Sequence, residues 1–366
     1  MPPAATQTRT ATRTPTRTPT RTATRTPTRT ATPAARTPTA VPSRTNTPVP
    51  PANTPPPVAT ATATPGGAPD SLALPIRAAF VYPWFPEAWT QHGIYPYTRY
   101  TPSLGYYNQN DPAILTRQIA AMQYGNIQAG IASWWGQGTP TDGRIPALLA
   151  AAHNTSFRWA LYYEAEGSGN PSVAQIQADL AYIHTRYMRD PNYLWVNGRP
   201  VIFVYGDGGD SCAMATRWAQ ANTIGAYVVL KVFSGYRTCG DQPAGWHQYG
   251  PAVATDSQAG YSFAISPGFY KADEAAPRLV RDLNRWQQNI RSMITSQAPW
   301  QLITTFNEWG EGTSVESSTG WASASGWGAY LDALHSNGGL APVTTNNPPG
   351  AAAQPQAPRD KEKRHR

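Results

Sequence analysis

WQLITTFNEWGEGT, residues 300–313, joins an apolar run to two carboxylates that stand three residues apart. The run 300–306 is typical of a strand buried in a sheet. Glu308 and Glu311 follow where such a strand would end, among aromatic residues and glycines. Two acids in such a setting are the usual means of breaking a glycosidic bond. The stretch therefore predicts a buried strand that delivers an acid pair to a sugar-binding site.

The residues before this stretch alternate between strand-like and helix-like segments. Apolar runs of strand length stand at 78–82, 128–134, 159–163, 200–205, 226–233, 250–255, 261–266 and 300–306. Helices are expected from Asp111, as the N-cap of Pro112, and at 170–187, 275–296 and 326–334. About eight β/α units are the count of a TIM barrel. The predicted fold class is therefore α/β, a (β/α)8 TIM barrel.

Composition divides the chain into three parts. Residues 1–69 are almost entirely Thr, Pro, Ala and Arg in a repeated pattern, and they hold too little apolar surface to offset the entropy of ordering them. They are predicted to be a disordered Thr/Pro/Arg-rich stalk or linker. Residues 70–340 have the size of one barrel and are predicted to form a glycoside-hydrolase-like catalytic domain. Residues 341–366 are predicted to be a disordered Pro/Ala-rich, basic tail.

The positive charge belongs to the ends of the chain. The net charge is +8, and the first 69 residues hold eight Arg and no acid. Residues 359–366 add +3, which leaves −3 for the residues between these two segments. A nucleic-acid-binding domain would carry its own basic patch, so no nucleic-acid partner is expected. The Arg repeat is either a solvated linker or an attachment to an anionic cell wall or membrane surface.

The cysteine pattern and the composition suggest a location outside the cell. Cys212 and Cys239 are either a disulfide between neighbouring loops or two free thiols. No spacing of ligands predicts a metal site, and no cofactor is expected. No signal peptide follows Met1, so the natural start is expected to lie upstream. The expectation is an extracellular or cell-surface monomer on a tether that acts on a polysaccharide or oligosaccharide.

Aromatic residues gather where the predicted strands end. Aromatic faces stack on the C–H faces of sugars, and the polar groups of Tyr and Trp bond to hydroxyls. The alternative is that these side chains fill the barrel and its upper layer. Their recurrence at several strand ends favours a site, and the predicted substrate-binding residues are Tyr82, Trp84, Trp134, Trp135, Tyr163, Glu164, Tyr205, Asn307 and Trp309.

The segment 307–313, NEWGEGT, resembles the Asn-Glu-Trp-x-Glu-Gly-Thr signature of glycoside hydrolase family 99 and its family-99-like (WbsX-like) relatives. Three weaker matches occur in the family's order, and they are Tyr82-Pro83-Trp84, residues 192–205 and Ser266-Pro267-Gly268. Together they cover most of residues 76–335. The resemblance implies a (β/α)8 enzyme that cuts inside α-mannoside chains with retention of configuration.

The same resemblance implies a role for each acid. Glu308 would accept the proton of the substrate's own 2-hydroxyl, whose oxygen then attacks the anomeric carbon. Glu311 would protonate the leaving oxygen and later activate water, which requires a raised pKa from partial burial and a neighbouring anion. Glu164 matches a position that binds sugar hydroxyls in the family.

One departure from the family pattern concerns the substrate. Catalytic members usually carry a His between the two acids, where this chain has Gly310. An α-mannan is the implied substrate, and a different α-glycan is the alternative. Two other functions stay open, a catalytically silent glycan-binding barrel and a surface adhesin that uses the Arg/Thr/Pro arm. Glu316 is expected either to be structural or to line the groove, and His247 either to be a packed or surface residue or to bind substrate.

Overall fold

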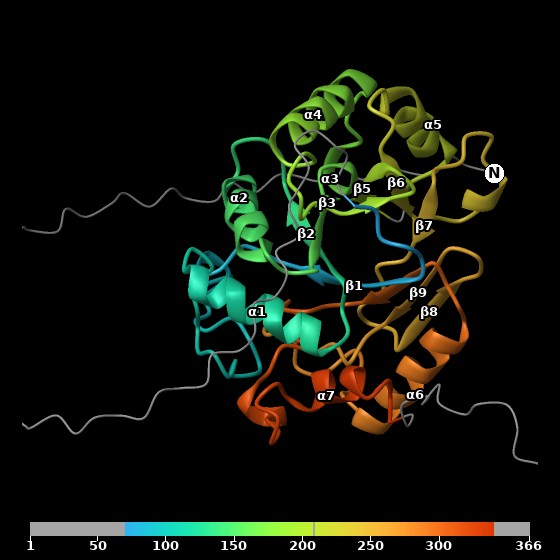
Figure 1. Ribbon diagram of the computed structural model, residues 1–366. Helices are drawn as coiled ribbons and strands as arrows, with labels where there is room; N and C mark the ends of the chain where they lie inside the picture. Colours follow the sequence, from blue (N-terminus) through green and yellow to red (C-terminus); the bar gives the residue numbers. More distant parts are fainter. Residues whose placement is uncertain (1–69, 208, 340–366) are drawn as a thin grey trace, which may run out of the picture. The chain divides into compact units, whose positions relative to one another are not determined.

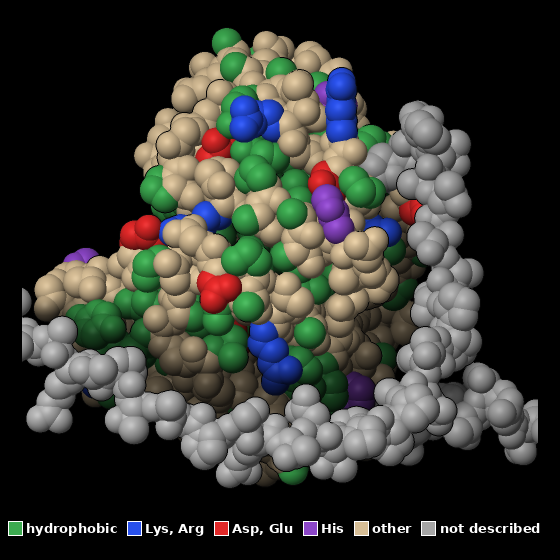
Figure 2. Space-filling view, turned by 60° about the vertical axis from the view of Figure 1, so that its left-hand side comes forward, with side chains coloured by type: hydrophobic (Ala, Val, Ile, Leu, Met, Phe, Trp, Pro, Cys, Tyr) green, Lys and Arg blue, Asp and Glu red, His purple; other side chains and the backbone are tan. Residues whose placement is uncertain are grey.

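The computed structural model describes residues 70–207 and 209–339. The predictions for residues 1–69 and 341–366 therefore lie outside the described residues. Among the described residues, no helix combines the length and the apolar character that crossing a bilayer requires. On the face drawn in Figure 2, Lys and Arg side chains are scattered among polar ones rather than gathered into one basic patch.

Eight parallel strands form a barrel at the centre of the described residues (Figure 1). These strands are β1 (Ile76–Val81), β2 (Ala129–Trp134), β3 (Arg158–Tyr163), β5 (Arg199–Val204), β6 (Tyr227–Lys231), β7 (Gly245–His247), β9 (Ser262–Ile265) and β10 (Trp300–Ile303). Their hydrogen-bonded order is β7-β6-β5-β3-β2-β1-β10-β9, and β8 (Thr255–Gln258) extends it as an antiparallel neighbour of β9. The short β4 (Trp195–Val196) pairs with β5. The ring is nearly closed, and the predicted TIM barrel is confirmed.

Helices surround these strands (Figure 1). They are α1 (Pro112–Tyr124), α2 (Pro140–Ala152), the single turn α3 (Glu166–Gly169), α4 (Val173–Arg186), α5 (Cys212–Ala221), α6 (Leu283–Thr295) and α7 (Ala329–His335). Three 3-10 turns complete the described structure, η1 (Glu87–Trp89), η2 (Tyr236–Thr238) and η3 (Thr319–Trp321). Asp111 caps α1 as expected, because its side chain accepts the backbone N–H of Ala113.

Several predicted boundaries are wrong. The strand expected at 250–255 lies instead at 245–247, and residues 255–258 pair antiparallel with β9. The helix expected from 275 begins only at Leu283, after the cap Asp282. The backbone of Leu279 pairs with that of Phe269, so this tertiary pairing takes the preceding residues out of the helix. The helices α2 and α5 were not predicted, and in the described residues no α-helix lies between β6 and β7 or between β7 and β8.

Alternation along each strand decides which side chains face the barrel interior. In β3, Ala160 and Tyr162 pack inside the barrel, whereas Trp159, Leu161 and Tyr163 pack against the helices. Successive side chains of a strand point to opposite faces, and both faces of these strands are buried. The residues just beyond each strand end are therefore the ones that can reach a site above the barrel.

A disulfide joins Cys212 at the start of α5 to Cys239 in the loop after β6, with the two Cα atoms 5.2 Å apart. This finding selects the disulfide over two free thiols. The bridge closes a loop with a sequence separation of 27 residues. Closing a loop of this length restricts the unfolded chain.

Replacing both cysteines, Cys212→Ser with Cys239→Ser, is expected to lower the free energy of unfolding by about 3 kcal/mol. Denaturant unfolding of the two proteins measures the difference. The matched control is reduction with dithiothreitol, which should destabilise the native protein and leave the double variant unchanged. Equal midpoints for the native and variant proteins would show that the bridge adds no stability.

Candidate active site

A pocket of about 260 Å³ opens at the C-terminal end of the barrel. Its lining residues follow the ends of most barrel strands, and they are Tyr82, Trp84, Gln91, Tyr97, Trp135, Glu164, Tyr205, Tyr249, Lys271, Glu308, Gly310 and Glu311. The C-terminal face is where TIM barrels carry their active sites. The pocket combines aromatic walls with three carboxyl groups.

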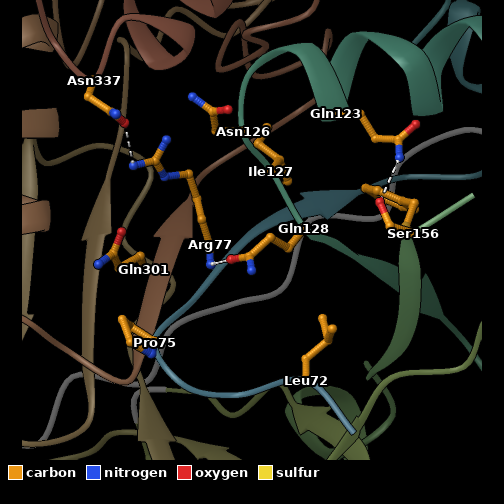
Figure 3. Close-up of a pocket in the computed structure, with 11 residues that line it drawn as sticks. Leu72, Pro75, Arg77, Gln123, Asn126, Ile127, Gln128, Ser156, Gln301 and Asn337 are labelled. Atoms are coloured by element: carbon orange, nitrogen blue, oxygen red, sulfur yellow. Dashed lines mark hydrogen bonds between the residues drawn. The ribbon is translucent and has the colours of Figure 1, made fainter. Parts of the chain in front are cut away.

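A larger hollow of about 550 Å³ lies at the opposite end of the barrel (Figure 3). Amide side chains and Arg77 line it, without a carboxylate. Arg77 donates to Asn337 and to the backbone oxygens of Gly125 and Leu334, at the ends of α1 and α7. The hollow therefore lies beside the contact by which Arg77 holds α1 and α7 to the barrel. It is on the N-terminal face, which in TIM barrels serves stability rather than catalysis.

A tight turn after β10 brings the two predicted acids together. The Glu308 N–H donates to Thr305 Oγ1 at 2.9 Å, and the Glu311 N–H donates to Glu308 Oε1 at 3.2 Å. Gly312 has a φ of +66° in this turn, and a Cβ there would lie 2.6 Å from the carbonyl oxygen of Tyr270. Only glycine fits at this point. The turn thus holds both carboxyl groups on one side of the pocket.

Burial raises the pKa of each carboxyl group in this pocket. The pKa of Glu308 lies well above its ordinary value because of burial and the neighbouring Glu311. Burial raises the pKa of Glu311 to about 7, although Lys271 and Arg278 oppose the rise. Burial raises that of Glu164 to about 8, against a 2.8 Å hydrogen bond from Ser133. Close carboxyl groups in an apolar setting cannot all be ionised, so the pocket retains protons near neutral pH.

Tyr249 is a site residue that the sequence analysis missed. The Tyr82 hydroxyl donates to the Tyr249 hydroxyl at 2.7 Å, which leaves the Tyr249 proton free for Glu311. The Tyr249 side chain is one of the influences that lower the Glu311 pKa, and burial raises the pKa of Tyr249 itself, so the phenol stays a neutral donor. Placing a strand at 250–255 put Tyr249 before a strand instead of after β7. Had the strand been expected at 245–247, Tyr249 would have been recognised as a residue just beyond a strand end.

Five of the predicted substrate-binding residues line the pocket, Tyr82, Trp84, Trp135, Glu164 and Tyr205. Trp134 and Tyr163 do not reach it. Their side chains point outward, where Trp134 Nε1 donates to Asp142 of α2 at 2.7 Å and the Tyr163 hydroxyl donates to Asp179 of α4 at 2.8 Å. A fully buried ring that faces a helix cannot stack on a sugar, so their expected role is revised to support of the barrel.

Asn307 and Trp309 are also buried away from the pocket lining. The Asn307 amide accepts from the backbone N–H of Tyr82 at 2.8 Å and donates to its carbonyl at 3.0 Å. It thereby ties the end of β1 to the end of β10. Trp309 donates to Glu316, a buried carboxylate that is therefore structural. The expected contact of Asn307 and Trp309 with substrate is revised to positioning of the turn.

Comparison with known proteins finds one family model and one curated relative that match the sequence. The model of glycosyl hydrolase family 99 matches residues 93–231, which include Trp135, Glu164 and Tyr205 and end before the Glu308–Glu311 turn. A glycoprotein endo-alpha-1,2-mannosidase of Xenopus laevis is 22% identical, over 59% of this chain and 57% of that protein. The chain thus spans just over half the length of this curated relative.

Two solved structures share the fold. The family 99 endo-alpha-mannosidase from Bacteroides thetaiotaomicron, in complex with bis-tris propane, superposes with a TM-score of 0.59 at 17% identity, over 72% of this chain and 95% of that one. A glycoside hydrolase-like protein gives 0.53 at 13% identity, over 75% and 96%. The predicted resemblance is confirmed: residues 93–231 match the model of glycosyl hydrolase family 99, and the chain shares its TIM-barrel fold with a family 99 endo-alpha-mannosidase.

Proposed function

We propose that the chain is an endo-acting glycoside hydrolase that cleaves internal α-mannosidic bonds with retention of configuration. The observation that carries this proposal is the pair Glu308 and Glu311, buried side by side on one turn at the C-terminal end of the barrel, with the pKa of both raised. Relatives that bear the name endo-alpha-mannosidase support the substrate class.

In the proposed reaction, Glu308 acts as the base and Glu311 as the acid. The ionised Glu308 takes the proton of the sugar's 2-hydroxyl, and the 2-oxygen attacks the anomeric carbon. The bond to the leaving oxygen breaks, and Glu311 gives that oxygen its proton. Water then attacks the same carbon and loses a proton to Glu311, the bond from that carbon to the 2-oxygen breaks, and Glu308 returns its proton to the 2-oxygen. Two inversions at one carbon give net retention.

The pocket walls match the chemistry of a sugar. Trp84 and Trp135 offer aromatic surface, and Trp135 is 45% exposed. Tyr205 and Glu164 add polar groups beside the acids. An apolar face flanked by a few hydrogen-bonding groups is how proteins hold pyranose rings.

Incubation of the full chain with α-1,2- and α-1,6-mannans, α-glucans and a β-mannan tests the proposal. We expect oligosaccharides from an α-mannan before any monosaccharide, with the α-anomer as the first product in NMR spectra. Release of mannose alone would replace an endo with an exo mode of action. Binding of a glycan without any cleavage would point instead to the glycan-binding barrel.

We also propose that the protein works outside the cell or at its surface. The Cys212–Cys239 disulfide supports this location, because such bonds form and persist in oxidising compartments. Attachment would depend on residues 1–69, whose eight Arg could bind an anionic surface. Removal of residues 1–69 should release the protein from anionic vesicles or cell walls and preserve turnover. Unchanged attachment would exclude this role for the segment.

A further inference from the structure

The backbone conformation at Gly310, between the two acids, does not require a glycine. The φ of Gly310 lies outside the left-handed region, so other residues could adopt it. A Cβ on Gly310 would lie only 3.0 Å from Cδ1 and Cε1 of the Tyr97 ring and 3.0 Å from Glu308 Oε1. Real Cβ atoms seldom make contacts this close. The packing of a distant side chain against the turn therefore accounts for the glycine.

Tyr97 is held firmly in this position. It belongs to the long connection between β1 and α1, and its N–H donates to the Trp89 carbonyl at 2.8 Å. Its ring packs beside His92, with the ring centroids 5.5 Å apart. Only 2% of the residue is exposed, yet the ring lines the pocket together with Glu308 and Glu311.

The Tyr97 hydroxyl is available to a ligand. It is buried, and Asp273 is its neighbouring acceptor, without a hydrogen bond of regular geometry. Burial raises its pKa to about 12, and the interaction of the hydroxyl with Asp273 and the nearby Glu308 add to the rise, so the group stays a neutral donor over the working pH range. A donor that its neighbouring carboxylate holds in poor geometry is free to turn to a ligand oxygen at small cost.

We propose that Tyr97 is a substrate-contacting residue of this site, and that it takes the space that a side chain at position 310 would fill. This inference rests on the proposed glycosidase function. The Tyr97 ring covers the backbone that joins the two acid-bearing residues. A sugar whose bond lies between those two carboxyl groups must touch the ring, and the hydroxyl is at hand for one of its oxygens.

A cycle of four proteins tests this packing: the native chain, Gly310→Ala, Tyr97→Ala and the double variant. Gly310→Ala is expected to lower kcat/KM by about tenfold or more, because even a small displacement of a catalytic group lowers the rate by such a factor. Tyr97→Ala should raise KM by about tenfold, the loss of one sugar contact. The double variant should fall within about threefold of Tyr97→Ala alone, because the methyl group then enters vacated space.

The control is Gly143→Ala in α2, where the added methyl group meets nothing within 4 Å. It should leave kcat/KM unchanged. Tyr97→Phe keeps the ring and removes the hydroxyl, so a rise in KM at unchanged Tm assigns a contact to the hydroxyl. If the fold losses in kcat/KM of the two single variants multiply in the double variant, the methyl group acts through Glu308 and not through Tyr97. That result would overturn the inference.

Binding separates this inference from the proposed function. Calorimetry with an α-linked mannotetraose is run on the same four proteins and on Tyr97→Phe, each with Glu311→Gln to prevent turnover. Weaker binding by the Tyr97 variants supports the contact even if no native turnover is found. Native turnover on mannan together with unchanged binding and unchanged KM in Tyr97→Ala and Tyr97→Phe would reject the contact and leave the glycosidase standing.

Discussion

Glu308→Gln is expected to lower kcat on α-mannan by about a thousandfold, with little change in substrate binding or Tm. The amide has the shape of the carboxylate but cannot accept the 2-hydroxyl proton, and a positioned base contributes about 10²–10⁴-fold. The hydrogen bond from the Glu308 backbone N–H to the Thr305 hydroxyl does not depend on the Glu308 side chain, so the turn should persist. Steady-state kinetics, calorimetry and thermal melting measure the three quantities.

A second buried carboxylate provides the matched control. Glu316 accepts hydrogen bonds from Gln118 at 3.0 Å, Tyr107 at 2.8 Å and Trp309 at 3.2 Å, and it does not line the pocket. Glu316→Gln places an amide against these donors, so it should lower Tm and change kcat by only a few fold. Comparable kcat losses in the two variants would mean that Glu308 acts through the fold rather than the reaction.

Local patterns explain why much of the fold and the acid pair could be predicted. The run 300–306 and the two acids after it lie next to each other in sequence, and apolar runs mark most of the other strands. Trp134 and Trp135 show where this information ends. Both faces of β2 are buried, so no polar alternation tells which side chain points inward and which points to α2. The sequence therefore did not show that Trp134 packs against α2 whereas Trp135 lines the pocket.

Contacts between distant segments could not be predicted at all. Tyr97 comes from an irregular connection and meets Gly310, which is more than 200 residues further along the chain. Lys271 reaches the pocket from the loop after β9. The periodicity of apolar residues does not predict such contacts, because they depend on how loops pack over the barrel and not on the helices and strands.

Glu311→Gln is expected to lower kcat/KM on α-mannan by about a thousandfold and to change its pH dependence. A general acid must hold its proton, and burial raises the Glu311 pKa to about 7. Native activity should therefore fall as the pH rises through about 7, since deprotonation removes the acid. In the variant this upper limb should disappear. Below pH 7 the protonated Glu311 is neutral, as is the amide that replaces it, so the acidic limb that Glu308 sets should stay in place.

Persistence of the upper limb in Glu311→Gln would assign that proton to another group. Glu164 is the candidate in the same pocket, because burial raises its pKa to about 8. Repeating the profile with Glu164→Gln then decides between the two carboxyl groups. Loss of the limb only with Glu164→Gln would move the acid role from the turn after β10 to the end of β3. If the upper limb of the pH profile disappears in Glu311→Gln and remains in Glu164→Gln, the catalytic proton belongs to Glu311, as the proposed reaction requires.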